Sequence, residues 1–183
     1  SFTISKLEYV GAQVGSELRE KGEWAMLIAL FSILIYVAIR FELIYGLGAI
    51  TALIHDVIIT LGVFSLFELT FDLSVLAAIL AVIGYSLNDS IVVFDRIREN
   101  NIILRKLSIL DVLDKSINQT LSRTLVTSLT TLLVIISLLV FGGDAVKNFS
   151  IAMFIGIIVG TYSSIFVAST SLSYFGIQRP EDS

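Results

Sequence analysis

The 183-residue sequence contains no cysteine, one histidine and one proline, and charged residues make up only 15 % of it. Without cysteine the chain can form neither disulfides nor thiolate metal sites. One histidine is too few for a multi-histidine metal centre. The net charge of −4 argues against nucleic acid as a partner, because such binding depends on neutralising phosphates. We therefore predict no metal, no cofactor and no nucleic acid.

The sequence is rich in long apolar stretches. Hydrophobic residues make up 56 % of the chain, whereas soluble domains contain about 45–50 %. A helix of roughly 20 apolar residues crosses the hydrocarbon core of a bilayer and satisfies its own backbone. The stretches that approach or exceed that length are 24–40, 43–67, 73–95, 121–141 and 149–175. They predict an all-α integral membrane protein, with a bundle of about five transmembrane helices in residues 23–178.

Basic residues lie mostly on one side of the predicted spans. They gather in and beside the connection between the third and fourth stretches, at Arg96, Arg98, Arg105, Lys106, Lys115 and Arg123. The facing connections, 68–72 and 142–148, contain only Lys147. Because cytoplasmic loops carry an excess of Lys and Arg, the basic segment is predicted to be cytoplasmic. Five spans then place the N-terminal segment in the periplasm and the tail at 179–183 in the cytoplasm.

Residues 1–22 are predicted to be the end of a periplasmic domain and a linker to the first span. Apolar residues alternate at their start as in a half-buried strand, at Phe2, Ile4, Leu7 and Tyr9. An isolated strand is not stable in water. We therefore expect the rest of its sheet to lie upstream, in a longer protein.

The cytoplasmic segment 97–120 is amphipathic and is predicted to form one short helix. Its apolar stripe comprises Ile109, Leu110, Leu113 and Ile117. Ser108 followed by Asp111 resembles a capping box at a helix start. The favoured interpretation is a helix lying on the inner leaflet, and the alternative is a helix that binds a partner.

Two ionisable residues inside the predicted spans are candidates for function, because an Asp or Arg at the centre of a span costs about 2.5–3.5 kcal/mol. Asp89 lies seven residues before Arg96, roughly 10 Å inside the cytoplasmic boundary. Arg123 enters the next span from the same side. Burial disfavours a charged carboxylate while a nearby guanidinium favours it, so the pair is predicted to act as a proton relay. The alternative is a static pair that locks two helices together.

Further polar residues accompany this pair. Tyr85 and Asn88 are predicted to share a helical face with Asp89. Thr127 is predicted to continue the face of Arg123. Each is a candidate either for the proton path or for pairing between helices.

His55 and Asp56 interrupt the second stretch roughly 18 Å from its inner end, near the bilayer midplane. Adjacent residues on a helix point in different directions, so we do not expect the two side chains to form one clamp. Each either bonds a neighbouring helix or takes part in the proton path. Gly156 and Gly160 form a G-x-x-x-G motif, which predicts close packing between helices.

Several segments resemble the SecF family of bacterial protein-export membrane proteins. They are GYSLNDSIVVFDRIREN at 84–100, HDVIITLG at 55–62, RTLVTS at 123–128 and FGG at 141–143. The segment VGAQVG at 10–15 is similar to a V-G-P-x-V-G element of the family, with Ala12 in place of proline.

The resemblance implies a six-helix membrane domain of the RND superfamily, of which this chain would hold the second to sixth spans. It implies a multi-pass subunit of the bacterial inner membrane that pairs with SecD and works beside the SecYEG translocon. Such a subunit uses the proton-motive force to assist the translocation of preproteins. In the family, the Asp of the N-D-S/T motif and the Arg of the R-T motif are associated with proton transport. Those positions are Asp89 and Arg123 here.

Three other functions are weighed against that one. A structural scaffold would hold Asp89 and Arg123 as a static lock, and a small-molecule proton antiporter would belong to the same superfamily. An intramembrane aspartyl protease would need Asp56 and Asp89 to share a proton. Because these two residues are predicted to lie at different depths, the chain is not expected to be an enzyme.

Overall fold

The computed structural model describes residues 12–40 and 43–177, and these residues are helical apart from short connections. The helices are α1 (Ala12–Arg40), α2 (Leu43–Leu66), α3 (Leu73–Ile103), α4 (Ile109–Phe141), α5 (Asp144–Tyr162), the π-helix η1 (Ser163–Val167) and α6 (Ala168–Phe175). The described part of the chain contains no strand, which confirms the predicted all-α class. The strand predicted at Phe2–Tyr9 lies outside the described residues.

Four helical segments of the described chain are long and apolar enough to cross a membrane: Leu43–Leu66, Leu73–Ile103, Ile109–Phe141 and Asp144–Phe175. The last comprises α5, η1 and α6, which follow one another without a break. The predicted stretch 24–40 lies within α1. The bundle is thus integral to a membrane, and each span reflects a long run of apolar residues without proline.

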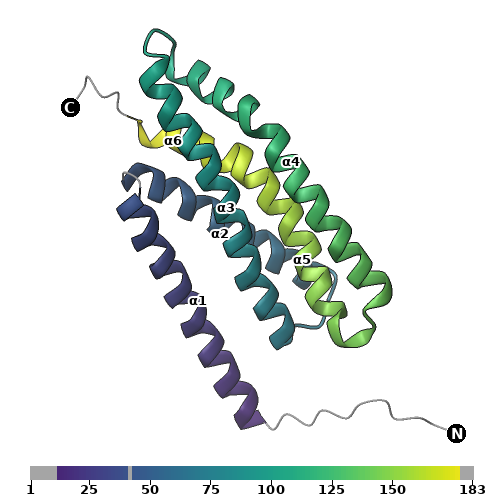
Figure 1. The fold of residues 1–183 in the computed structure, drawn as a ribbon. Helices are drawn as coiled ribbons and strands as arrows, with labels where there is room; N and C mark the ends of the chain where they lie inside the picture. The colour runs from purple at the N-terminus through teal and green to yellow at the C-terminus, as the bar shows by residue number, and fades with distance from the viewer. Residues whose placement is uncertain (1–11, 41–42, 178–183) are drawn as a thin grey trace, which may run out of the picture.

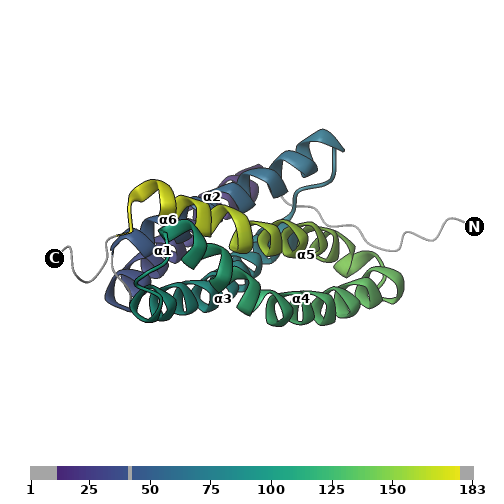
Figure 2. The same ribbon diagram turned by 90° about the horizontal axis from the view of Figure 1, so that it is seen from above.

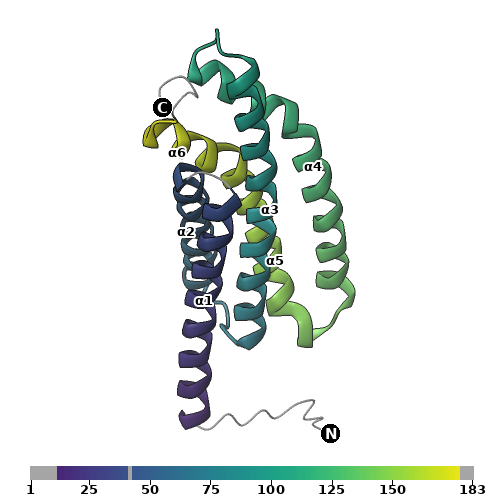
Figure 3. The ribbon, with the colours of Figure 1, turned by 60° about the vertical axis from the view of Figure 1, so that its left-hand side comes forward.

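Helix α5 occupies the middle of the bundle. It packs against α3, α4 and α2, while α2 also contacts η1 and α6 (Figure 1). Seen from above, α3 and α4 lie on one side and α2 and α6 on the other (Figure 2). The α3–α4 connection and α6 lie at one end of the bundle, and the α2–α3 and α4–α5 connections lie at the other (Figure 3). The helices therefore alternate in direction, as spans of a multi-pass protein do.

The close approach of α5 to α3 depends on two glycines. A Cβ added at Gly156 would lie 2.3 Å from Val82 Cγ2, and one added at Gly160 would lie 3.1 Å from Ser86 Cβ. The G-x-x-x-G motif therefore faces α3, where small residues let the two backbones approach.

The short helix predicted within 97–120 begins where it was predicted, but it continues into the next span without a break. Helix α3 continues to Ile103 and α4 begins at Ile109, so the segment contains a helical hairpin. Ser108 caps α4 in a complete capping box with Asp111, in which each side chain accepts from the other residue's backbone N–H. Buried Asn100 joins the two helices, because its Nδ2 donates to Ser116 Oγ and Gln119 Oε1, both at 2.9 Å. The predicted capping box at Ser108 and Asp111 is confirmed.

At the other end of the bundle, Asp72 caps the start of α3. Its Oδ1 accepts from the backbone N–H of Ser74 at 2.8 Å and of Val75 at 3.1 Å, and from Ser74 Oγ at 2.6 Å. Partial burial raises the pKa of Asp72, but hydrogen bonds from Ser74, Asn148 and Val75 outweigh burial and hold that pKa below its ordinary value.

Candidate functional site

Asp89 lies on the buried face of α3 and is only 4 % exposed. Its Oδ2 has no hydrogen-bond partner within the described residues. A second buried polar atom without a partner, Thr124 Oγ1, belongs to α4. Such atoms are costly in an apolar environment unless a water, an ion or a proton satisfies them.

The register between α3 and α4 places these two atoms at the same level. Tyr85 Oη donates to Ser128 Oγ at 3.2 Å, and this bond aligns the two antiparallel helices. Asp89 follows Tyr85 by one turn, and Thr124 precedes Ser128 by one turn. Both therefore lie one turn from the bond, in the direction of the α3–α4 hairpin. The structure brings together a carboxylate and a hydroxyl that lack partners.

Arg123 approaches Asp89 from the neighbouring helix. Its guanidinium is close enough to interact electrostatically with the Asp89 carboxylate, yet Asp89 Oδ2 accepts no hydrogen bond. Arg123 lines a cleft of about 210 Å³ whose other lining residues are Val92, Asp95, Arg96, Glu99, Gln119 and Thr120. Every α3 residue of this cleft lies beyond Asp89 in the direction of the hairpin. The cleft thus lies between the level of Asp89 and the hairpin end of the bundle, and Arg123 belongs to its lining.

A second carboxylate, Asp56 on α2, is completely buried. Ser86 Oγ of α3 donates to Asp56 Oδ2 at 2.5 Å. The other carboxylate oxygen, Oδ1, lies 3.1 Å from His55 Nδ1. The expectation that His55 and Asp56 do not form one clamp is therefore wrong, because the His55 ring turns back toward its neighbour. His55 also stacks on Tyr162, with ring centroids 6.4 Å apart.

Gly160 makes room for the contact between α2 and α3. A Cβ at this position would lie 3.6 Å from Asp56 Oδ2 as well as close to Ser86. The π-helix η1 begins three residues later, at Ser163. Local π-helical turns often occur at functional sites, where the extra residue in the turn reorients neighbouring side chains.

The remaining predicted residues separate into two groups. Tyr85 takes part in the α3–α4 contact described above, and Ser128 Oγ also bonds Thr161 Oγ1 at 2.6 Å, which extends the contact to α5. Thr127 Oγ1 donates to Arg123 O of its own helix at 2.9 Å. Asn88 is exposed and points away from the buried face that holds Asp89. The residues predicted to share one polar face of α3 therefore do not all face the same way, because Asp89 is buried and Asn88 is exposed.

Four hydroxyls of the site were not predicted from the sequence: Ser86, Thr124, Ser128 and Thr161. Ser86 precedes Asp89 by three residues, a helical spacing that could have indicated a shared face. Nothing in the sequence distinguishes Thr124 from the other threonines of α4. Its importance comes only from the register of two helices.

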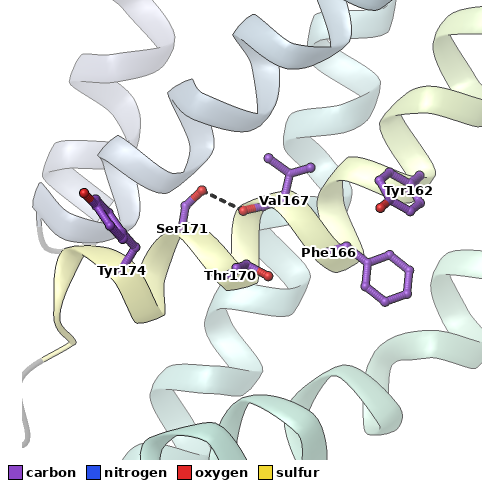
Figure 4. A pocket seen from close by; sticks show the side chains of 6 residues that line it. All are labelled: Tyr162, Phe166, Val167, Thr170, Ser171 and Tyr174. Carbon is purple, nitrogen blue, oxygen red and sulfur yellow. Dashed lines mark hydrogen bonds between the residues drawn. The ribbon is translucent and has the colours of Figure 1, made fainter.

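The larger groove of the structure lies elsewhere. It has a volume of about 430 Å³ and is lined by Tyr162, Phe166, Val167, Thr170, Ser171 and Tyr174 (Figure 4). Ser171 Oγ donates to Val167 O within the same helix at 2.7 Å. The hydroxyl of Ser171 thus already has a hydrogen-bond partner, and the groove is a mainly apolar outer face.

Within the described residues, no group of three or more His, Cys, Asp or Glu side chains could hold a metal ion.

Comparison with known proteins identifies relatives along almost the whole chain. Residues 1–178 match the family described as protein export membrane protein SecD/SecF, C-terminal. The chain is 55 % identical over 174 residues to the protein translocase subunit SecF of Pseudomonas aeruginosa, which covers 95 % of this chain and 57 % of that protein. It is 58 % identical over 170 residues to the same subunit of Calditerrivibrio nitroreducens, covering 92 % and 56 %. The chain therefore spans a little more than half the length of these relatives.

Two solved structures share the fold. A crystal structure of SecDF from Thermus thermophilus, described as a translocon-associated membrane protein, superposes with a TM-score of 0.86 at 51 % identity. The match covers 90 % of this chain and 23 % of the SecDF chain. A SecDF crystal structure in a super-membrane-facing form gives a TM-score of 0.82 at 48 % identity, covering 90 % and 22 %.

Proposed function

Because the chain belongs to the protein export membrane protein SecD/SecF family, we propose that it works in a proton-driven protein translocase. In this proposal it is the C-terminal membrane portion of a SecF subunit of the RND superfamily. It pairs with SecD, lies beside the SecYEG translocon in the bacterial inner membrane and assists preproteins in crossing that membrane. The printed names of its relatives, protein translocase subunit SecF and SecDF, support this assignment.

The observation that carries the proposal is the environment of Asp89. This carboxylate is buried within a membrane span, its Oδ2 lacks a partner among the described residues, and a guanidinium lies near it without closing a hydrogen bond. A carboxylate held in that way can gain and lose a proton at small cost in packing. A static lock would instead be expected to close its hydrogen bonds, because incomplete pairing of a buried charge is destabilising.

The proposed cycle uses Asp89 as the proton carrier and Arg123 as its permanent counter-charge. A proton from the periplasmic side binds Asp89 Oδ2 and neutralises the carboxylate, which weakens the attraction to Arg123. Helices α3 and α4 then shift relative to each other. The proton leaves Asp89 through the cleft on the hairpin side, where Arg96 and Glu99 form an ion pair of 2.9 Å. Arg123 cannot release protons itself, because guanidinium stays charged in proteins.

In this proposal the hairpin end of the bundle faces the cytoplasm, because basic residues gather near the hairpin. Asp89 then receives protons from the periplasm and releases them toward the cytoplasm. Each proton that crosses gains about 2.3 kcal/mol per 100 mV of membrane potential. That free energy is available to repack the helices that hold Asp89 and Arg123.

The proposal is tested with Asp89→Asn in the full-length protein, assembled with SecD and SecYEG in vesicles. Asparagine has nearly the same shape but cannot carry a proton. We expect the complex to assemble and basal translocation to continue, while stimulation by the proton-motive force is lost. Normal stimulation in the variant would exclude the proton-carrier role. Loss of assembly would support the scaffold, in which the pair only holds helices together.

A further inference from the structure

Asp56 is the second buried carboxylate of the bundle, and the proposed cycle gives it no role. Asp56 contacts one residue of α3 and one of its own helix, α2. Ser86 Oγ of α3 donates to Asp56 Oδ2 at 2.5 Å, and His55 Nδ1 lies 3.1 Å from Asp56 Oδ1. The His55 side chain is 28 % exposed, whereas the Asp56 side chain is completely buried. The three residues thus form a continuous polar chain from the outer face of α2, within its membrane-spanning segment, to the interior of α3.

This polar chain ends one turn from Asp89. Ser86 precedes Asp89 by three residues in α3, so the two side chains share a helical face and lie roughly 4.5 Å apart along the axis. Ser86 lies on the side of the α2–α3 connection, whereas the cleft with Arg123 lies on the hairpin side. Asp56 and the cleft therefore flank Asp89 from opposite ends of the bundle. In the proposed orientation, Asp56 is on the periplasmic side.

We propose that His55, Asp56 and Ser86 form the entry relay that delivers protons to Asp89. The inference rests on the proposed function, because it assumes that Asp89 carries protons. His55 accepts a proton from the periplasmic side and passes the proton on Nδ1 to Asp56 Oδ1. The carboxyl group turns and donates this proton to Ser86 Oγ, and Ser86 releases its own hydroxyl proton toward Asp89. A water can bridge the remaining gap along α3, and each residue ends with the protons it had at the start.

The surroundings of Asp56 favour proton exchange over a permanent ion pair. His55 is the titratable group in contact with it, Tyr162 of α5 stacks on His55, and Asp89 lies one turn away on α3. Helix α5 presents Gly160 to the carboxylate. The π-helix η1 contains no titratable residue, and the one in α6, Tyr174, is exposed near the end of that helix. His55 is thus the titratable group with which Asp56 is in position to exchange a proton.

A purely structural role would not require an acid at this position. An amide could accept the same hydrogen bond from Ser86 at a lower cost of burial than a carboxylate. This difference makes Asp56→Asn the critical variant. Asparagine keeps an oxygen for Ser86 and an amide near His55, but it cannot accept or release a proton.

The test measures proton influx in vesicles that contain the full-length protein with its SecD partner, using a pH-sensitive dye and an acid pulse outside. We expect Asp56→Asn to reduce the rate by about 10²-fold, the contribution typical of a positioned acid–base group. His55→Gln should also lower the rate, because glutamine cannot accept and pass on a proton. Ser169→Ala is the control, because Ser169 is buried on α6 and its hydroxyl donates to the carbonyl oxygens of Ile165 and Phe166 in the preceding turn. The control variant should show the same rate of proton influx as the unaltered protein. An unchanged rate in Asp56→Asn would show that the relay is absent.

If Asp56→Asn does not assemble, infrared spectroscopy replaces the flux measurement. In an Asp89→Asn background, we expect a band from a protonated carboxyl group that shifts when Ser86 is changed to alanine. No band sensitive to Ser86→Ala would overturn the relay. This readout does not require Asp89 to carry protons. Conversely, if Asp89→Asn stops proton influx while Asp56→Asn does not, the proposed function stands and the entry relay is wrong.

Discussion

Asn148 Nδ2 donates to Asp72 Oδ2 at 2.8 Å, although the two residues are 76 positions apart in the sequence. The bond ties the start of α3 to the first turns of α5 at the end of the bundle opposite the hairpin. Asp72 also caps α3 through its other oxygen. One carboxylate thus fixes the relative position of the two helices that hold Asp89 and the G-x-x-x-G motif.

The stability of the bundle should therefore depend on the charge of Asp72 at low pH. Its pKa is lower in the folded protein than the value of about 3.9 expected for an unfolded chain. Its contribution to stability is complete above that value and is lost as the pH falls through the folded-state pKa. We expect the midpoint of thermal unfolding in detergent to fall below about pH 4. In Asp72→Asn this component should be missing, and an unchanged pH profile of the variant would contradict the assignment.

Gly156→Ala should destabilise the protein. The added Cβ would lie 2.3 Å from Val82 Cγ2, and the β-branched valine has little freedom to move away. Overpacking of this kind typically costs about 1–3 kcal/mol, which should appear as a lower unfolding midpoint. Gly62→Ala in α2 is the control, because a Cβ there meets nothing within 4 Å. That substitution should be neutral or slightly stabilising, since alanine is the better helix former.

Steric overlap is separated from other effects by a second substitution. Val82→Ala removes the atoms that the new Cβ would strike. The double variant with Gly156→Ala and Val82→Ala should be more stable than the sum of the single effects predicts, by about 0.5–3 kcal/mol. Additive effects would show that the helices do not approach each other at this point.

The hairpin should be weakened by Asn100→Ala. The Asn100 amide donates to both Ser116 and Gln119, and its side chain is buried between α3 and α4. Removing it leaves those acceptors without their donor, at a cost of about 1–3 kcal/mol. Hydrogen exchange should accelerate locally at the hairpin. The matched control is Asn118→Ala, because Asn118 is exposed and bonds only within its own helix, at Asp114. Equal exchange rates in the two variants would argue against this role of Asn100.

Hydropathy was sufficient to predict the class of the fold and the approximate position of the four helical segments that are long and apolar enough to cross a membrane, because the bilayer requires apolar runs of defined length. Counting residues from the predicted membrane boundary put Asp89 and Arg123 at similar depth, and in the structure the two are close enough to interact electrostatically. Depth depends only on the rise of a helix, which varies little. Each of these features can be predicted from the sequence of a single helix, without knowledge of how the helices pack.

Contacts between helices could not be predicted in this way. Asn88 and Asp89 are neighbours in sequence, yet one is exposed and the other buried, because the rotation of α3 is set by its packing on α5. The bond between Asp56 and Ser86 likewise requires Gly160 to let three helices meet. The extension of α3 to Ile103, and of α4 from Ile109 into the membrane span, was not predicted because amphipathicity reports which face of a helix is apolar and not where the helix ends.

Arg123→Lys and Arg123→Met separate the charge of Arg123 from its shape. Arg123 is exposed in the cleft, so either substitution should change the free energy of unfolding by less than about 1 kcal/mol. Lysine keeps the positive charge near Asp89 and should retain proton influx at a reduced rate, whereas methionine removes the counter-charge and should abolish it. Arg98→Met is the control, because Arg98 is exposed on α3 and does not line the cleft. Influx at the normal rate in Arg123→Met would show that Asp89 exchanges protons without a counter-charge from α4.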